Sequence, residues 1–207
     1  MKVEILGSAG ATTAPRPGCD CAICGEARSR GVPYARTGPS LFLHGADVLF
    51  DTPEESPFQL DRAGIRRIAG CFYSHWHPDH TMGRRVWELR NADWRTWPLE
   101  RRRRVETPIY LPAQVAEDFR SHLGHWEHFT FMAGQGWVRL IELSDGEVVD
   151  VDGTRIMPFR VAEDYVYAFL VEDGRSRALL APDELNGWVP PADLGPLDLA
   201  VLPMGVC

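Results

Sequence analysis

Residues 74–80 read SHWHPDH, which places three imidazole rings and one carboxylate within six positions after Ser74. These groups cannot all be buried in an apolar core, because each polar ring needs a partner there. A metal ion is a partner that they can share. His75 and His77 alternate as residues at the end of a strand do, and Pro78 then breaks the strand. Asp79 and His80 begin the next segment, and we expect their side chains to point toward nearly the same place as those of His75 and His77. The segment therefore predicts a metal site, with solvated loop histidines as the alternative.

The flanks of this motif support the same prediction. Residues 69–73 form a short apolar run that suits a buried strand. In residues 81–91, Met82, Val86 and Leu89 recur at helical spacing. The order of strand, ligand-bearing loop and helix is typical of a rigid scaffold that presents a metal site.

Length and charge limit the classes of protein to consider. At 207 residues the chain is expected to form one globular domain, 1–207, with a substantial core. A net charge of −7 argues against general nucleic-acid binding. The sequence has no apolar run of membrane-spanning length, and its first residues, MKVEILGSAG, lack a cleavable signal pattern. We therefore expect a cytoplasmic protein without membrane association. A homodimer is compatible with the sequence, which does not fix the oligomeric state.

Three of the five cysteines cluster as C-x-C-x₂-C at Cys19, Cys21 and Cys24. In a reducing compartment this spacing indicates metal ligation or redox chemistry more than a disulfide framework. Three thiolates suit one tetrahedral zinc, which needs a fourth ligand such as Cys207, a histidine or a residue beyond the given sequence. Three unligated thiols on a polar loop are the alternative. Cys71 lies in an apolar run and is expected to be a small buried side chain.

The remaining pattern predicts strands separated by turns, with few helices. A helix is expected from Pro53 to about Ala63, and a polar stretch runs from the cysteines to Pro39. Residues 93–137 differ in composition, and we expect them to form an insertion over the core, partly helical, with one strand at 108–111. The expected strands are 3–6, 40–43, 47–50, 69–73, 138–143, 147–151, 154–159, 165–171, 177–181 and 197–202.

This order of elements predicts layered α/β packing. The last expected strand, 197–202, has the composition of a core strand. A core strand needs a following element to cover it, so we expect the chain to lack a C-terminal portion of its domain.

The motif, with Asp51 upstream and Asp183 downstream, resembles the metallo-β-lactamase superfamily. The resemblance implies an αββα sandwich, in which two packed mixed sheets carry helices outside, and a site for two metals at one edge. Residues 18–24, GCDCAIC, resemble the branch that contains the phosphodiesterase of the carbon–phosphorus lyase pathway, in which such cysteines hold a structural zinc. On this resemblance Cys19, Cys21 and Cys24 would bind that zinc.

The resemblance also implies roles for the motif residues. His75 and His77 would bind the first metal, and Asp79 and His80 the second. Asp183 would bridge both metals, and a turn carboxylate is its alternative reading. Asp51 would orient a histidine ligand by accepting a hydrogen bond from its other ring nitrogen. Asp79, His80 and Asp51 are thus the expected catalytic groups.

Two departures from the family pattern affect the metal shell. Residues 160–164 read RVAED, with Ala162 where the family has a further histidine. Glu163 or Asp164 could supply an oxygen ligand instead, which favours Mn or Fe over Zn. The last histidine of the family has no counterpart before Cys207.

The expected function is a metal-dependent hydrolase of a small anionic phosphodiester. In such a site two divalent metal ions, Zn or Mn/Fe, share a water and lower its pKa, which gives a bridging hydroxide nucleophile. The same scaffold hosts many reactions, so a lactone, thioester or β-lactam hydrolase is an alternative. A non-catalytic metal-binding protein is the third hypothesis, because of Ala162.

Two further clusters of polar residues have less specific meaning. His122, His125 and His128 recur every three residues, and they could line a cleft or bind a metal. A partly exposed helix or loop is the commoner explanation. The arginine run at 101–104 could attract an anionic substrate, although a solvated charged face is the commoner explanation.

Overall fold

The computed structural model describes residues 1–94, 105–161 and 164–203, and its strands form two sheets. The first sheet has the order β1-β2-β3-β4-β5-β6, and the second has the order β11-β10-β9-β8-β7. The strands of the first sheet are β1 (Lys2–Gly7), β2 (Ser40–His44), β3 (Val48–Phe50), β4 (Gly70–Phe72), β5 (Thr107–Pro112) and β6 (Val138–Leu143). Those of the second sheet are β7 (Val149–Val151), β8 (Thr154–Arg160), β9 (Tyr167–Glu172), β10 (Arg177–Leu180) and β11 (Leu199–Val201).

Both sheets are mixed. The first has antiparallel pairs at β1–β2 and β2–β3 and parallel pairs from β3 to β6. The second is antiparallel from β7 to β10 and ends with the parallel pair β10–β11. The helices are α1 (Ala22–Arg30), α2 (Ser56–Arg62), α3 (Pro78–Thr81), the 3₁₀ turn η1 (Met82–Arg85), α4 (Val86–Asn91), α5 (Ala113–Ser121) and α6 (His125–Gly134).

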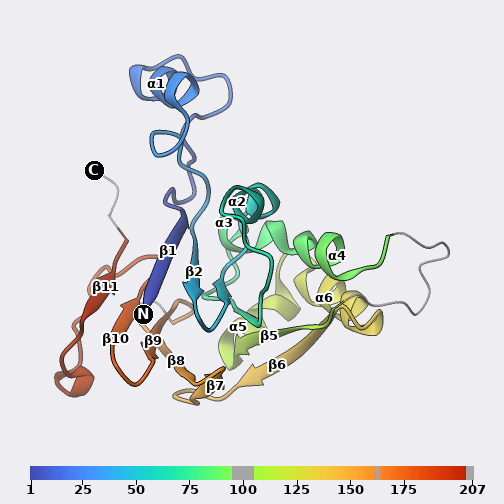
Figure 1. The fold of residues 1–207 in the computed structure, drawn as a ribbon, viewed down its shortest axis with the longest axis vertical. Coiled ribbons are helices and arrows are strands. Elements are labelled where there is room, and N and C mark those ends of the chain that lie inside the picture. Colours follow the sequence, from blue (N-terminus) through green and yellow to red (C-terminus); the bar gives the residue numbers. More distant parts are fainter. Residues whose placement is uncertain (95–104, 162–163, 204–207) are drawn as a thin grey trace.

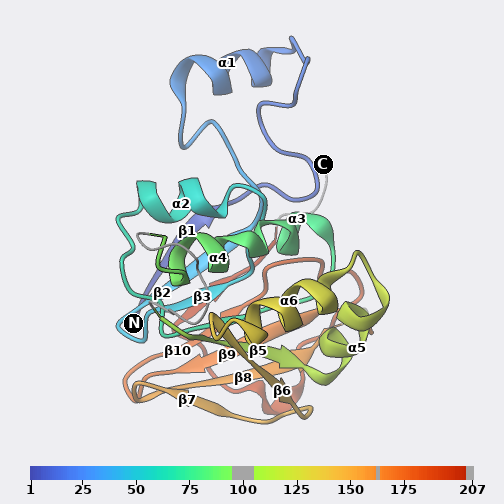
Figure 2. The ribbon, with the colours of Figure 1, turned by 90° about the vertical axis from the view of Figure 1, so that its right-hand side faces the viewer.

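Figure 2 shows α2, α4 and α6 over the first sheet, with β7 to β10 on its opposite side. Two apolar clusters hold these layers together. One joins α5 and α6 to the first sheet, with Phe119 and Phe129 packed near Ile109. The other lies between the sheets, where the rings of Phe72 and Phe169 are 5.7 Å apart. Burial of such large apolar surfaces is the main favourable contribution to this packing.

The residues that follow β3, β4 and β10 lie along one edge of the two sheets. All residues of β3 and β4 are buried, as expected for parallel strands covered on both faces. Asp51 directly follows β3, and His75 comes three residues after β4 ends. Asp183 comes three residues after β10 in the second sheet. The two sheets therefore present motif residues along one shared edge.

The two packed mixed sheets with outer helices confirm the expected fold class. After β6 the described chain forms only strands and one short 3₁₀ turn, η2 (Ala192–Leu194). The predicted strands are present with shifts of a few residues at their ends, and β6 has the predicted bounds. Among the described residues, no helix is long and apolar enough to span a membrane.

The region expected as an insertion differs from the prediction. β5 lies inside the first sheet between β4 and β6, and α5 and α6 supply Phe119, Phe129 and Met132 to its core. Residues 105–137 are thus part of the layered fold rather than an addition over it. The arginine run at 101–104 lies outside the described residues.

Three local predictions are corrected. Residues 22–30 form α1 within the stretch expected only to be polar. This helix has no apolar stripe by which the sequence could predict it, and only Cys24 and Ala27 are buried. Residues 81–91 are helical as predicted, but they form the end of α3, η1 and α4 rather than one regular helix, and Met82 and Leu89 are exposed. α2 begins at Ser56 rather than at Pro53.

The last strand is also less buried than expected. In the part of the chain that the structure describes, β11 pairs with β10 alone and forms the edge of its sheet, with Leu199 40% exposed. Within the described residues it is thus the edge strand of the second sheet, and its expected place in a core stays a prediction.

Candidate metal centre

Three of the expected ligands converge at the shared edge of the two sheets. His75 and His77 follow β4, and Asp183 follows β10. One ligand atom from each of these three side chains lies within 4.8 Å of the other two. Nε2 of His75 lies 3.1 Å from Oδ2 of Asp183. The structure thus joins residues that are more than 100 positions apart in the sequence.

His80 and Asp79 lie beside this group. Nε2 of His80 is 3.6 Å from Oδ2 of Asp79 and 3.7 Å from Oδ2 of Asp183. Oδ2 of Asp183 therefore lies close to Nε2 of both His75 and His80. The expected role of Asp183 as a carboxylate shared by two metals stays a prediction.

Asp51 is fully buried and forms hydrogen bonds that fix Ser74 and the His80 ring. Its carboxylate accepts hydrogen bonds from the Ser74 backbone N–H at 2.7 Å and from the Ser74 hydroxyl at 2.6 Å. Its Oδ2 atom also lies 2.8 Å from Nδ1 of His80. The backbone of Asp51 has a φ of 60°, a left-handed conformation in which aspartate is one of the better tolerated residues.

These contacts determine which ring nitrogens carry hydrogen. Because the Asp51 carboxylate can only accept, Nδ1 of His80 donates to it. The Ser74 hydroxyl proton is used by Asp51, so Nδ1 of His75, 2.9 Å from Oγ of Ser74, is the donor in that contact. In the neutral rings both Nε2 atoms are then lone-pair acceptors.

The donor chemistry of the site fits a divalent cation. Nε2 of His75 and Nε2 of His80 are both buried without a hydrogen-bond partner in the structure, although both face Asp183. Two lone pairs buried opposite a carboxylate are unfavourable unless a cation lies between them. Imidazole nitrogen with carboxylate oxygen is a ligand set suited to Zn, Mn or Fe.

The surroundings of these groups shift their pKa values in opposite directions in the metal-free chain. Burial, together with the neighbouring His80, lowers the pKa of His75, which favours its neutral, metal-binding form. Burial alone would lower the pKa of His80, but Asp51 outweighs it and raises that pKa. Burial opposes ionisation of Asp183, yet its contacts with His75 and His80 lower its pKa to about 2.

The region of the missing family histidine is only partly described. Ala162 and Glu163 lie outside the described residues, so a ligand role for Glu163 stays a prediction. Asp164 is exposed, and its backbone carbonyl accepts a hydrogen bond from Arg160.

Tyr165 is a neighbour of the centre that the sequence reasoning missed. Its half-buried ring has its centroid 5.3 Å from that of His77 and 6.1 Å from that of His75. The ring therefore forms an aromatic wall beside the two ligands. A single tyrosine at the start of a predicted strand carries no sequence signal for such a position.

The cysteine cluster forms a second candidate metal site. One sulfur atom from each of Cys19, Cys21 and Cys24 lies within 4.8 Å of the other two. The Arg16 guanidinium donates to the Cys19 sulfur, and the Arg16 backbone N–H donates to the Cys24 sulfur, both at 3.3 Å. Three clustered thiols fit three sides of a tetrahedral zinc site, and Cys207 lies outside the described residues. Cys71 is fully buried between the layers, as expected.

The three spaced histidines do not share one helix face. α5 ends at Ser121, so His122 lies in the turn before α6 and stacks on Trp76 at 4.1 Å. His125 is fully buried, and Nε2 of His128 lies 2.6 Å from Glu88. In the described residues they form no group of metal ligands.

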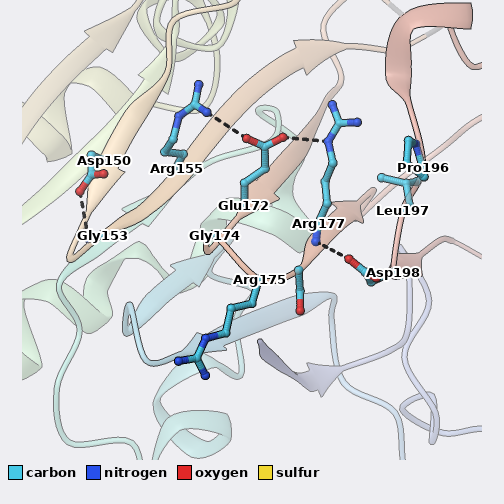
Figure 3. Close-up of a pocket in the computed structure, with 11 residues that line it drawn as sticks. Asp150, Gly153, Arg155, Glu172, Gly174, Arg175, Arg177, Pro196, Leu197 and Asp198 are labelled. Atoms are coloured by element: carbon cyan, nitrogen blue, oxygen red, sulfur yellow. Dashed lines mark hydrogen bonds and ion pairs between the residues drawn. The ribbon is translucent and has the colours of Figure 1, made fainter.

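A surface pocket of about 490 Å³ lies at the opposite ends of β9 and β10 from the metal ligands. Figure 3 shows that Glu172 bridges two arginines there, Arg155 at 3.1 Å and Arg177 at 2.8 Å. Because these cations are already paired, the pocket does not offer them to an anionic substrate. The candidate chemistry therefore stays with the motif residues.

Comparison with known proteins gives a family for this arrangement. The sequence model of the family described as "Beta-lactamase superfamily domain" matches residues 37–207. Ribonuclease Z of Archaeoglobus fulgidus is 30% identical over 166 residues, which cover 77% of this chain and 50% of that protein. The chain thus spans about half the length of this curated relative.

Two solved structures have the same fold. A diphosphatase from the PhnP family matches with a TM-score of 0.63 and 24% identity, over 86% of this chain and 64% of the other. Zn²⁺-bound PqqB from Methylobacterium extorquens matches with a TM-score of 0.67 and 19% identity, over 88% of this chain and 65% of the other. From the family match and the fold, the chain belongs to the metallo-β-lactamase superfamily.

Proposed function

We propose that this chain is a divalent-metal-dependent hydrolase that cleaves a phosphodiester bond in a small anionic molecule. The observation that carries the proposal is the pair of buried, unpartnered Nε2 atoms of His75 and His80, which face the carboxylate of Asp183. Such an arrangement is costly for folding alone, so it argues for a site built for a cation.

The residues of the chain have separable roles in this proposal. His75, His77 and Asp183 would hold one cation, while Asp79 and His80 would hold a second with Asp183 between them. Asp51 keeps the His80 ring in the tautomer that leaves Nε2 free. Bound divalent cations supply Lewis acidity, which lowers the pKa of water and polarises a phosphoryl or carbonyl oxygen.

The proposal that the cleaved bond is a phosphodiester is supported by a relative and by the net charge, not by the metal ligands. Ribonuclease Z, by its name, cleaves RNA, and RNA is joined by phosphodiesters. The net charge of −7 disfavours a long polyanion as the substrate of this chain and favours a small one. RNA cleavage is the second candidate, because the relative with that name is 30% identical.

The test combines metal content with a substrate panel. We would measure metals per chain and assay bis(p-nitrophenyl) phosphate, a cyclic ribose phosphate, a short RNA, a lactone, a thioester and a β-lactam. His77→Ala removes one ligand, and His44→Gln is the control, because His44 contacts Glu4 on the first sheet. We expect diester turnover that falls at least about 100-fold in His77→Ala and stays unchanged in His44→Gln.

Each other outcome has a distinct meaning. Turnover of the RNA alone would replace the small substrate with a polymer, and turnover of the lactone, thioester or β-lactam alone would change the bond. Bound metal without any turnover would favour a non-catalytic metal-binding protein. A chain that binds no divalent metal would overturn the proposal.

A further inference from the structure

A buried histidine outside the ligand set contacts the motif. His125 begins α6 and is fully buried, with its ring stacked on Phe119 at 4.6 Å. Its Nδ1 atom lies 2.7 Å from the backbone oxygen of His122, and its Nε2 atom lies 2.7 Å from Oγ1 of Thr81. Both ring nitrogens are therefore engaged, one within the turn before α6 and one on the element that carries the motif.

The direction of these bonds follows from the groups that make them. A backbone oxygen only accepts, so Nδ1 of His125 carries the hydrogen in the contact with His122. In the neutral ring Nε2 is then an acceptor, and the Thr81 hydroxyl donates to it. Burial, with Arg84 nearby, lowers the pKa of His125 to about 4, so the neutral ring prevails near pH 7.

Thr81 occupies a central place in the motif. It is the last residue of α3 and directly follows His80. The backbone oxygens of His77, at 2.8 Å, and Trp76, at 3.2 Å, are alternative acceptors for the Thr81 hydroxyl, whose single proton they share with Nε2 of His125. The Thr81 hydroxyl thus lies against the segment that carries His77. The Thr81 backbone directly follows Asp79 and His80.

Two further contacts join the same turn to the motif. Arg84, 8% exposed, donates to the backbone oxygen of Thr81 at 3.4 Å and to that of Leu123 at 3.3 Å. The His122 ring stacks on Trp76, which stands between the ligands His75 and His77 in the sequence. The turn at residues 122–125 therefore contacts the motif at Trp76 and, directly and through Arg84, at Thr81.

We propose that His125 is a positioning residue of the metal centre, which holds the α3 turn through the Thr81 hydroxyl so that Asp79 and His80 face Asp183. Metal sites require their ligands within about 0.5 Å of the binding geometry, and second-layer contacts supply that precision. Asp51 fixes the His80 ring, whereas His125 fixes the backbone turn that carries it. This inference rests on the metal centre of the proposed function but not on its substrate.

The test uses a matched pair of variants at Thr81. Thr81→Val keeps the shape and removes the hydroxyl, and Thr81→Ser keeps the hydroxyl. His125→Phe keeps the ring stacking on Phe119 and removes both hydrogen bonds. Affinities for Zn²⁺ and Mn²⁺ would be measured by chelator competition, and Co²⁺ absorption spectra would report the ligand geometry. The thermal midpoint of the metal-free chain would be recorded for every variant.

We expect Thr81→Val and His125→Phe each to weaken the weaker-binding metal position about 10-fold and to change the Co²⁺ spectrum. Thr81→Ser should stay within about 2-fold of the wild type. The double variant should bind no more weakly than His125→Phe, because both changes remove the same contact.

The remaining outcomes separate the inference from the function. Variants that melt earlier but bind metal with wild-type affinity and an unchanged Co²⁺ spectrum would overturn the inference and leave the function standing. Weaker metal binding in Thr81→Val, with no turnover of any substrate by the wild type, would support the inference and overturn the function. A wild-type chain that binds no metal would overturn both.

Discussion

The two groups of candidate metal ligands are held in very different ways. Around the metal centre, Asp51, Ser74, His75 and His80 are all fully buried and linked by contacts of 2.6 to 2.9 Å. The cysteines lie on residues 8–37, here called the cysteine arm, which carries α1 away from the two sheets (Figure 1).

Burial explains the difference. Within the cysteine arm only three apolar side chains are buried, Ala14, Cys24 and Ala27, and all three are small. A segment that buries so little apolar surface gains little stability from packing and depends on other cross-links, of which a structural zinc is one. The centre is thus organised by the fold before any metal binds, whereas a metal would organise the arm.

Loss of Asp51 should have the largest effect. Asp51→Ala leaves the Ser74 donors and Nδ1 of His80 buried without an acceptor, and it places alanine at a φ of 60°. We expect the free energy of unfolding to fall by about 3–5 kcal/mol. Urea denaturation of the metal-free chain measures this change.

The control for that experiment is Asp61→Ala, because the Asp61 side chain is 84% exposed and its ion pair with Arg66 spans 3.7 Å. Its effect should stay below about 1 kcal/mol. A loss at Asp51 as small as that of the control would show that the centre is not organised by the fold, and the comparison with the arm would fail.

Removal of one thiol should affect the arm alone. Cys24→Ser takes away the buried sulfur of the cluster, so the chain should bind about one zinc fewer and α1 should lose its protection from hydrogen exchange. β4 should keep its protection, because no residue of the arm belongs to the core around it. Exchange measured by mass spectrometry tests both statements, with Ser29→Ala as the control in the same helix. Loss of protection that spreads to β4 would contradict the independence of the two regions.

The elements around the centre could be predicted because their signals are local. The buried runs of β4 and β6 and the turn that Pro78 imposes are visible in a few adjacent residues, and the family resemblance supplied Asp183. Asp183 lies 3.1 Å from His75 and 3.7 Å from His80, and its role as a shared metal ligand stays a prediction.

The elements that were missed depend on tertiary contacts or lack a pattern. α1 has no apolar stripe, and β5 takes its place in the sheet only through pairing with β4 and β6. Tyr165 lies about 90 positions from the histidines that it contacts, and His125 lies 44 positions from Thr81. No single sequence reveals such pairs, since neither residue type nor spacing marks them.

The pKa of Cys19 tests whether the arm holds its sulfur atoms together without zinc. The Cys21 backbone N–H, neighbouring thiols and Arg16 stabilise the thiolate and lower the pKa of Cys19 to about 6. Because the folded value is depressed, the thiolate stabilises the folded arm above the ordinary thiol pKa, and this stability is lost as the pH falls through about 6. In the zinc-free chain, alkylation of Cys19 should thus rise to half its maximum near pH 6.

Mass spectrometry of iodoacetamide adducts at Cys19 measures this profile, with the urea-unfolded chain as the reference for an ordinary thiol. A profile that is the same in the folded and unfolded chains would show that the zinc-free arm does not hold its sulfurs together. The difference between the ordered metal centre and the arm would then be larger than the structure indicates.

The smallest effect is expected at Arg28. This exposed side chain donates to the backbone oxygens of Cys19 at 2.6 Å and of Arg16 at 2.9 Å, which joins α1 to the cysteine loop. Water can replace these donors at the surface, so Arg28→Met should cost at most about 1 kcal/mol. That corresponds to about a 5-fold loss of zinc affinity, measured by competition, with no change in the urea midpoint of the whole chain. A loss of 10-fold or more would show that side-chain hydrogen bonds order the arm before zinc binds, as those of Asp51 order the metal centre. The two regions would then differ in exposure but not in what orders them.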